Sequence, residues 1–199
     1  MVGLIRQPSF LLYDYSFLKT LPLAEWQNGF AEIIKHACIK DAAMFKELQQ
    51  HRLSDYKKDV SLLKKLIERN VMLKTKVVFA DEREQGERKL LNFGHTLGHA
   101  IENMYELSHG QAISIGMTYA TIISQQLKGF KDTDAVVSLL ANYGLPTFAG
   151  FDAKKAFRVL QKDKKKDDVS IHYILLEKTG KAVVQPLLFV QLKEIFKQF

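Results

Sequence analysis

The sequence predicts a mainly α-helical fold with one small β-hairpin. Apolar residues recur at helical spacing along most of the chain, and two short apolar runs flank Thr179-Gly180 near its end. With 199 residues, 47% of them hydrophobic and 26% charged, the chain has the composition of a globular protein that can bury a core without disulfides. We therefore expect one helical domain over residues 1–199.

The first part of the chain is predicted to hold one extended segment and two helices. Residues 10–13 form an apolar run between Pro8 and Asp14, which favours a single strand or an extended entry segment. Pro22 suits the start of a helix. Helical spacing of apolar residues then predicts two helices, at Ala24–Ile39 and Tyr56–Phe79.

The rest of the chain is predicted to be helical around the hairpin. The charged stretch Asp81–Glu87 interrupts the pattern before a helix at Arg88–Tyr105. Further helices are predicted at Gln111–Leu127, Asp132–Ala141, Ala153–Gln161 and Phe189–Phe196. The hairpin strands are predicted at Ile171–Leu176 and Ala182–Val184. A Gly-rich phosphate loop is absent from the sequence, so we expect no dinucleotide site within this chain.

The net charge and the cysteine content indicate the cellular compartment and the possible partners, but they do not indicate the activity. The net charge of +7 fits either a nucleic-acid surface or the attraction of small anions. Because the sequence has no nucleic-acid-binding signature, we expect no nucleic-acid partner. The lone Cys38 predicts a reducing compartment, and the apolar runs fall short of the roughly 18 residues of a membrane span. These features predict a cytoplasmic protein without a membrane partner.

One segment gathers polar side chains at helical spacing. Intervals of four, three, four and three residues separate Arg88, Asn92, His95, His99 and Glu102. On one continuous helix they would share a stripe roughly 80° wide. A polar solvent face is the simplest interpretation, but Gly94 and Gly98 precede the two histidines, and each costs a helix about 1 kcal/mol. That cost indicates close approach by a ligand or by another backbone.

The histidines also predict a metal site. His109 follows in a loop, where a sharp turn would return it to the His95 face. With Glu32 from the first helix, these two supply three ligands and leave an open position, as catalytic zinc requires. Other sets fit as well, because His95 with His99 forms an i, i+4 pair and His36 lies one turn from Glu32. Spacing alone does not rank them.

Three segments resemble the C-terminal domain of 3-dehydroquinate synthase. They are LPLAEWQNGFAEIIKHACIKD, LKTKVVFADEREQGERKLLNFGHTLGHAIE and SHGQAISIGM, and the resemblance continues through KDKKKD and ILLEKTG. It implies the helical C-terminal domain of a dehydroquinate synthase-like fold. It also implies an enzyme of the shikimate pathway that cyclises 3-deoxy-D-arabino-heptulosonate 7-phosphate to 3-dehydroquinate and phosphate, using NAD and zinc or another divalent metal such as cobalt.

The resemblance also implies roles for particular residues. It assigns the metal to Glu32, His95 and His109. It assigns catalytic roles to Lys35, Lys74, Arg88, Asn92 and His99. It assigns contacts with the anionic sugar-phosphate substrate to Glu84, Lys164 and Lys165, the last two near the phosphate. His99 then belongs to the substrate or phosphate side rather than to the metal.

Some features depart from the family pattern. Ala24 stands where many members carry arginine, Gln111 replaces the usual glutamate of the HGE motif, and the segment from His99 to His109 is short. The family's N-terminal nucleotide-binding domain, which carries the NAD site, is absent from this sequence. We therefore expect the chain to be inactive alone, and the resemblance implies a homodimer for the complete enzyme.

Two other functions remain open at this point. The first is another sugar-phosphate cyclase or a metal-dependent polyol dehydrogenase of the same superfamily, since such relatives share the GHT-xx-H and HG pattern. The R-x-x-x-N-x-x-H-x-x-x-H run and the DKK motif favour dehydroquinate synthase. The second is a non-catalytic helical module that only binds metal.

Overall fold

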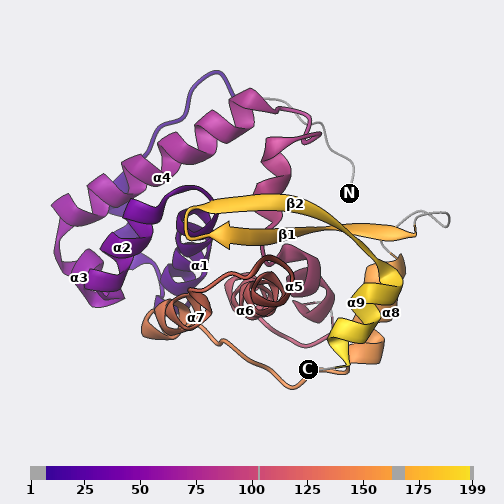
Figure 1. The fold of residues 1–199 in the computed structure, drawn as a ribbon. Coiled ribbons are helices and arrows are strands. Elements are labelled where there is room, and N and C mark those ends of the chain that lie inside the picture. The colour runs from indigo at the N-terminus through magenta and orange to yellow at the C-terminus, as the bar shows by residue number, and fades with distance from the viewer. Residues whose placement is uncertain (1–7, 103, 163–168, 198–199) are drawn as a thin grey trace.

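A computed structural model describes residues 8–102, 104–162 and 169–197, which form a set of helices and one antiparallel hairpin (Figure 1). In chain order the elements are η1 (Tyr15–Thr20), α1 (Leu23–Lys40), α2 (Ala42–Gln50), α3 (Leu53–Lys58), α4 (Val60–Ala80), η2 (Glu87–Asn92), α5 (His95–Glu102), α6 (His109–Lys128), α7 (Thr133–Asn142), α8 (Ala153–Lys162), β1 (Ser170–Lys178), β2 (Lys181–Leu188) and α9 (Phe189–Phe196). The predicted fold class is confirmed.

Helix α6 forms the centre of the core. It is buried on nearly all sides from Gly110 to Ser124, and it contacts α1, α5, α7 and β1. A helix that is apolar all round belongs inside a protein, and the few polar side chains in it must find partners. The hydroxyl of Ser124 donates to the carbonyl of Ala120 and accepts from the backbone N–H of Leu176, which ties α6 to β1.

The hairpin is confirmed, with strands longer than predicted. Strand β1 pairs with β2 in antiparallel register, with Ile174 opposite Val184. The backbone N–H of Gly180 in the turn donates to the carbonyl of Cys38 at 2.8 Å. This bond attaches the turn to the end of α1, so the sheet lies across the helices (Figure 1).

Several helix boundaries differ from the prediction. The helix predicted at Tyr56–Phe79 begins too early, because Asp59 ends α3 and caps α4 by accepting from the backbone N–H groups of Ser61 and Leu62. The sequence analysis missed α2, which Asp41 caps in the same way. The helix predicted from Ala24 is confirmed as α1, and those predicted from Gln111 onwards are confirmed as α6 to α9, with ends shifted by at most two residues.

The single helix predicted at Arg88–Tyr105 is wrong. The chain forms η2, leaves helical geometry at Gly94, whose φ is +79°, and starts again as α5 at His95. A Cβ on Gly116 of α6 would lie 1.9 Å from the carbonyl oxygen of Gly94, so the two backbones touch there. The close approach inferred from the glycines is therefore made by another backbone and not by a ligand.

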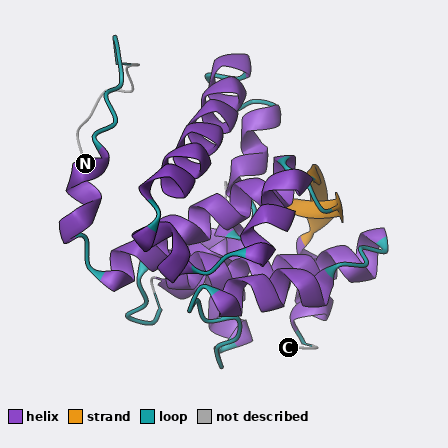
Figure 2. Ribbon diagram, turned by 90° about the vertical axis from the view of Figure 1, so that its left-hand side faces the viewer, coloured by secondary structure: helices purple, strands orange, loops and turns teal. Residues whose placement is uncertain are grey.

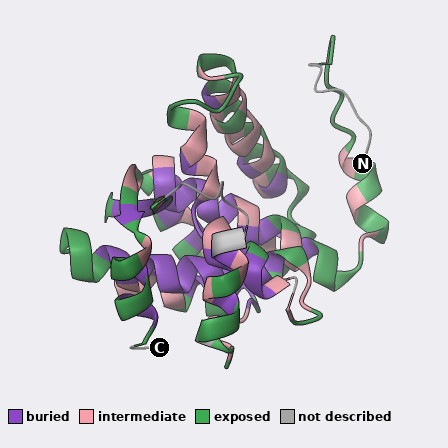
Figure 3. Ribbon diagram, turned by 90° about the vertical axis from the view of Figure 1, so that its right-hand side faces the viewer, coloured by how far each residue is buried: buried purple, intermediate pink, exposed green. Residues whose placement is uncertain are grey.

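The N-terminal segment lies at the edge of the molecule. Residues 8–14 have no regular secondary structure, so of the two predictions for residues 10–13 the extended segment is the one observed. Figure 2 shows this segment and η1 at the edge of the helical body, and Figure 3 shows them largely exposed while the buried residues gather at the centre. Phe10 and Leu12 are more than four-fifths exposed, at 82% and 85%.

Two further predictions concern the role of Cys38 and the presence of membrane-spanning helices. Cys38 is fully buried in α1, and burial raises the pKa of its thiol, as expected for a packing residue rather than a nucleophile. Among the helices of the described residues, none combines the length and the apolar character that crossing a membrane would require.

Candidate metal centre and active site

The three predicted metal ligands come together from three different helices. Glu32 lies on α1, while His95 and His109 are the first residues of α5 and α6. One donor atom from each lies within 4.8 Å of the other two. The Nε2 atoms of His95 and His109 lie 3.6 and 3.5 Å from Oε1 of Glu32. Two imidazole nitrogens and one carboxylate oxygen thus surround a common point.

The state of the Glu32 carboxylate fits a cation at that point. Its Oε2 atom accepts a hydrogen bond from Nζ of Lys35 at 2.6 Å, whereas its Oε1 atom is buried without a hydrogen-bond partner among the described residues. A buried carboxylate oxygen without a partner is costly, and a cation between Oε1 and the two Nε2 atoms would satisfy it. The donor set is one that divalent zinc accepts in catalytic sites.

The protonation states also suit metal binding. Burial alone would raise the pKa of Glu32, but the charge and hydrogen bond of Lys35, with a smaller contribution from His95, lower it to about 2. Burial, followed by the charge of Lys35, lowers the pKa of His95 to about 4. At neutral pH the carboxylate is ionised and the His95 ring is neutral, which are the forms that bind a metal.

The other ligand sets that the sequence left open do not form three-donor groups among the described residues. His36 belongs to no three-donor group among the described residues. His95 and His99 have ring centroids 5.1 Å apart but share no such group. The structure instead forms a second group, which the sequence analysis did not anticipate, from His99, Glu102 and His109.

A cavity of about 420 Å³ opens beside the metal-ligand group. Eight predicted site residues line it: Glu32, Lys35, Lys74, Glu84, Arg88, Asn92, His95 and His109. They come from α1, α4, the turn before η2, η2 itself, α5 and α6. The remaining predicted residues lie elsewhere: His99 lines a neighbouring cavity, and Lys164 and Lys165 fall outside the described residues.

The five polar residues do not share one helix face, so that prediction is wrong. Arg88 and Asn92 belong to η2, and the break at Gly94 separates them from His95 and the rest of α5. Arg88 and Asn92 nevertheless line the same cavity as His95, because the chain turns at the break. The guanidinium of Arg88 is held by a hydrogen bond from Nη1 to the carbonyl of Glu82, at 2.6 Å.

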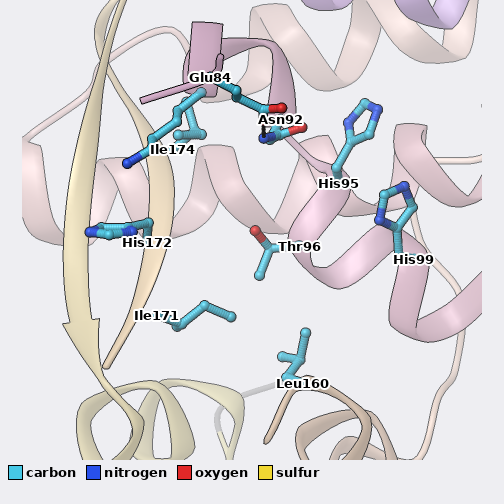
Figure 4. Close-up of a pocket in the computed structure, with 10 residues that line it drawn as sticks. Glu84, Asn92, His95, Thr96, His99, Leu160, Ile171, His172 and Ile174 are labelled. Carbon is cyan, nitrogen blue, oxygen red and sulfur yellow. Dashed lines mark hydrogen bonds between the residues drawn. The ribbon is translucent and has the colours of Figure 1, made fainter. Parts of the chain in front are cut away.

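The neighbouring cavity, of about 440 Å³, extends from α5 to the hairpin. It shares Glu84, Asn92 and His95 with the first. Figure 4 shows His95 and His99 on one side and Ile171 and His172 of β1 on the other. Neither His172 nor the hairpin was assigned to the site from the sequence, because only the packing of β1 against α6 and η2 brings them there.

Glu84 occupies a strained position between the two cavities. Its φ of +57° makes it the only described residue other than glycine with a positive φ. The carboxylate of Asp81 holds the turn by accepting from the backbone N–H groups of Gln85 and Gly86. Oε1 of Glu84 accepts from Nδ2 of Asn92 at 2.5 Å. Such strain is often found at functional sites.

The strain at Glu84 predicts a difference between two substitutions. Glu84→Ala and Glu84→Gly both remove the side chain, but only glycine adopts the left-handed conformation without cost. We expect the glycine variant to be more stable than the alanine variant by about 1 kcal/mol in urea unfolding. Equal stabilities, or a more stable alanine variant, would show that the turn is not strained.

Comparison with known proteins defines the family. A sequence model described as 3-dehydroquinate synthase C-terminal matches residues 29–166, which include all three proposed metal ligands. The chain belongs to the 3-dehydroquinate synthase C-terminal family. The match agrees with the resemblance found in the sequence.

Curated 3-dehydroquinate synthases are similar over nearly the whole chain. The protein of Halalkalibacterium halodurans is 38% identical over 193 residues, which are 93% of this chain and 53% of that protein. The protein of Leptospira interrogans is 37% identical over 188 residues, 92% of this chain and 52% of that protein. The chain thus spans about half the length of the curated 3-dehydroquinate synthases it matches.

Solved structures of sugar-phosphate cyclases share the fold. A 2-deoxy-scyllo-inosose synthase in complex with carbaglucose-6-phosphate, NAD+ and Co2+ superposes with a TM-score of 0.82 at 26% identity, covering 100% of this chain and 58% of that one. A 2-epi-5-epi-valiolone synthase from Streptomyces hygroscopicus, with NAD+ and Zn2+ bound, gives a TM-score of 0.79 at 24% identity, covering 93% and 54%.

Two departures from the 3-dehydroquinate synthase pattern, Gln111 and Ala24, leave the proposed metal-ligand group intact. Gln111, in place of the usual glutamate, closes a capping box at the start of α6: its Oε1 accepts from the backbone N–H of Ser108, whose hydroxyl accepts from the N–H of Gln111. Glutamine and glutamate both serve in this motif, so His109 keeps its place. Ala24 is exposed in the first turn of α1.

Proposed function

We propose that this chain is the metal- and substrate-binding half of a 3-dehydroquinate synthase, which converts 3-deoxy-D-arabino-heptulosonate 7-phosphate to 3-dehydroquinate and phosphate. The observation that carries the proposal is the convergence of Glu32, His95 and His109 beside a cavity that Lys74 and Arg88 also line. A metal site next to fixed cations suits a substrate that carries both hydroxyl groups and anionic groups.

Glu32, His95 and His109 would hold zinc, or another divalent metal such as cobalt. When bound, the metal would supply positive charge that acidifies the substrate hydroxyl to be oxidised. The protein prepares the site through Lys35, which is 3% exposed and binds one oxygen of Glu32, so that the other oxygen faces the two histidines. The same ion pair keeps the charge of Lys35 from standing unpaired in the interior.

The remaining cavity residues would bind and orient the substrate. A guanidinium can pair with a carboxylate through two hydrogen bonds, and Arg88 is already held at its Nη1 atom. Asn92, fixed by Glu84, offers its amide oxygen to a substrate hydroxyl. His99, in the neighbouring cavity, would lie towards the phosphate, with Lys164 or Lys165. Positioning of this kind is what ring opening and aldol closure mostly require.

The oxidation needs a hydride acceptor, which we place in a separate nucleotide-binding domain. The sequence of this chain contains no Gly-rich phosphate loop, so NAD would bind outside it. We further propose that the complete enzyme is a cytoplasmic homodimer. The chain alone is expected to release no phosphate when NAD and the heptulosonate are added.

A fusion protein tests the proposed function. The N-terminal half of the Halalkalibacterium halodurans relative, joined to this chain, is expected to release phosphate from the heptulosonate in the presence of NAD and zinc, with the intact relative as the positive control. The His109→Ala fusion should be inactive. A folded fusion that binds NAD and zinc but releases no phosphate would contradict the proposal.

A second cyclase activity is the alternative, because 2-deoxy-scyllo-inosose synthase shares the fold at a TM-score of 0.82. The same fusion distinguishes the two activities when its product is identified. A carbocycle without the carboxylate of 3-dehydroquinate, formed from another sugar phosphate, would favour the alternative.

A further inference from the structure

His109 is the most exposed of the three proposed metal ligands. Its side chain is 46% exposed, compared with 30% for Glu32 and 13% for His95. A metal ligand must be held close to its productive geometry by packing or by hydrogen bonds from its surroundings. Since packing covers only half of the His109 side chain, other contacts have to fix the ring.

Both ring nitrogens of His109 face a carboxylate. Nε2 lies 3.5 Å from Oε1 of Glu32, on the metal side, and Nδ1 lies 3.3 Å from Oε2 of Glu102. A histidine that binds a metal commonly donates its second ring N–H to a carboxylate, which fixes the tautomer and the ring orientation. A proton on Nδ1 shared with Glu102 leaves the lone pair of Nε2 directed at the metal.

Glu102 comes from the same helix as another ligand. It is the last residue of α5, and His95 is the first. Residues seven apart lie on nearly the same face of an α-helix, so α5 presents a metal ligand at one end and the partner of His109 at the other. The orientation of His109 is thereby linked to the placement of His95.

The backbone around His109 is fixed by a separate contact. Oδ1 of Asn28 accepts from the hydroxyl of Ser108 at 2.8 Å and from the backbone N–H of Gly110 at 3.2 Å. Asn28 precedes Glu32 by one turn of α1. A Cβ on Gly110 would lie 2.5 Å from Cα of Asn28, which shows how closely α6 approaches α1. The backbone of His109 is therefore anchored, and the ring is the part that Glu102 must hold.

Glu102 also belongs to the second three-donor group, with His99 and His109. That group would use Nδ1 of His109, and the first group uses Nε2. The first group contains Oε1 of Glu32, which is buried and has no hydrogen-bond partner among the described residues, so a cation would satisfy it. The geometry therefore indicates that Glu102 is a hydrogen-bond partner of the ligand His109 and is not itself a metal ligand.

We propose that Glu102 is a positioning residue, which orients the imidazole of His109 for metal coordination. The proposal rests on the metal site of the proposed function. It predicts that Glu102 affects metal affinity without being coordinated itself. Outer-shell partners of this kind typically change metal affinity by about 10- to 100-fold.

Metal titrations of the purified chain test the proposal. Zinc affinity is measured by competition with a chromophoric chelator, for wild type, Glu102→Gln, Glu102→Ala and His109→Ala. Glu106→Gln is the matched control, because Glu106 is an exposed glutamate in the connection that follows Glu102, between α5 and α6. Visible absorption of the cobalt(II) forms reports the coordination number, and thermal melting of the metal-free forms reports any general loss of structure.

We expect Glu102→Ala to lower zinc affinity by about 10- to 100-fold and Glu102→Gln by less, since the amide oxygen still accepts a hydrogen bond. The cobalt spectrum and the metal-free melting temperature should stay close to wild type, as should every property of Glu106→Gln.

Unchanged affinity in Glu102→Ala would overturn the proposal. So would a loss as large as that of His109→Ala with an altered cobalt spectrum, which would make Glu102 a ligand. Failure of the wild-type chain to bind zinc would instead remove the metal site of the proposed function.

Discussion

His95→Ala is expected to lower the zinc affinity of this chain by more than about 100-fold. Loss of a direct ligand should exceed the 10- to 100-fold loss that outer-shell changes cause. In the proposed site His95 is one of three donors, and its Nε2 atom lies 3.6 Å from Oε1 of Glu32. Removal of the ring leaves two protein ligands, fewer than the three that catalytic zinc sites use. A competition titration with a chromophoric chelator at neutral pH measures the loss.

His51→Ala is the matched control for that prediction. His51 follows α2, lies at the edge of the Tyr56 ring and belongs to neither three-donor group. Its replacement should leave zinc affinity unchanged. Equal affinities of wild type, His95→Ala and His51→Ala would place zinc somewhere other than the proposed site.

Gly116→Ala is expected to destabilise the fold by about 3 kcal/mol, at the upper end of the range for overpacked cores. A Cβ there would lie 1.9 Å from the carbonyl oxygen of Gly94 and 2.9 Å from the backbone nitrogen of Gly98. Backbone atoms cannot rotate out of the way, so α5 and α6 must separate. For a chain of this size the melting temperature should fall by about 6–12 °C. Thermal unfolding by circular dichroism measures the change.

Gly29→Ala is the matched control, with an expected effect of opposite sign. Gly29 lies in α1, and a Cβ added there would meet nothing within 4 Å. Alanine should therefore stabilise the helix by up to about 1 kcal/mol. If Gly116→Ala melted at or above the temperature of the wild type, the close packing of α5 on α6 would be wrong.

The parts of the fold with strong local patterns could be predicted from the sequence. Helix α1 and helix α6 carry apolar residues at helical spacing over several turns, and the strands flank a turn sequence. The break at Gly94 could not be found in this way, because polar residues continue at helical spacing on both sides of it. It depends on the backbone of α6 at Gly116, a contact that exists only after folding. The short helix α2 was missed, and α3 was merged with α4 in the prediction, because few turns give little periodicity.

The proposed metal ligands were only partly predictable. Spacing within the chain selected His95, but it ranked neither His99 nor His36 below His109. The choice depends on where α1 places Glu32 and on which nitrogen of His109 faces it, and both are properties of helix packing. The proposed role of Glu102 follows from the same packing. The spacing placed Glu102 in the polar stripe but did not indicate that it faces His109, and nothing in the sequence pointed to Asn28.

The most direct test of the metal centre is a crystal structure of the zinc-loaded chain, with anomalous differences measured at the zinc edge. We predict one peak about 2.0–2.2 Å from Nε2 of His95, Nε2 of His109 and Oε1 of Glu32. A peak bound by His99, Glu102 and Nδ1 of His109, or no peak beside Glu32, would contradict this assignment.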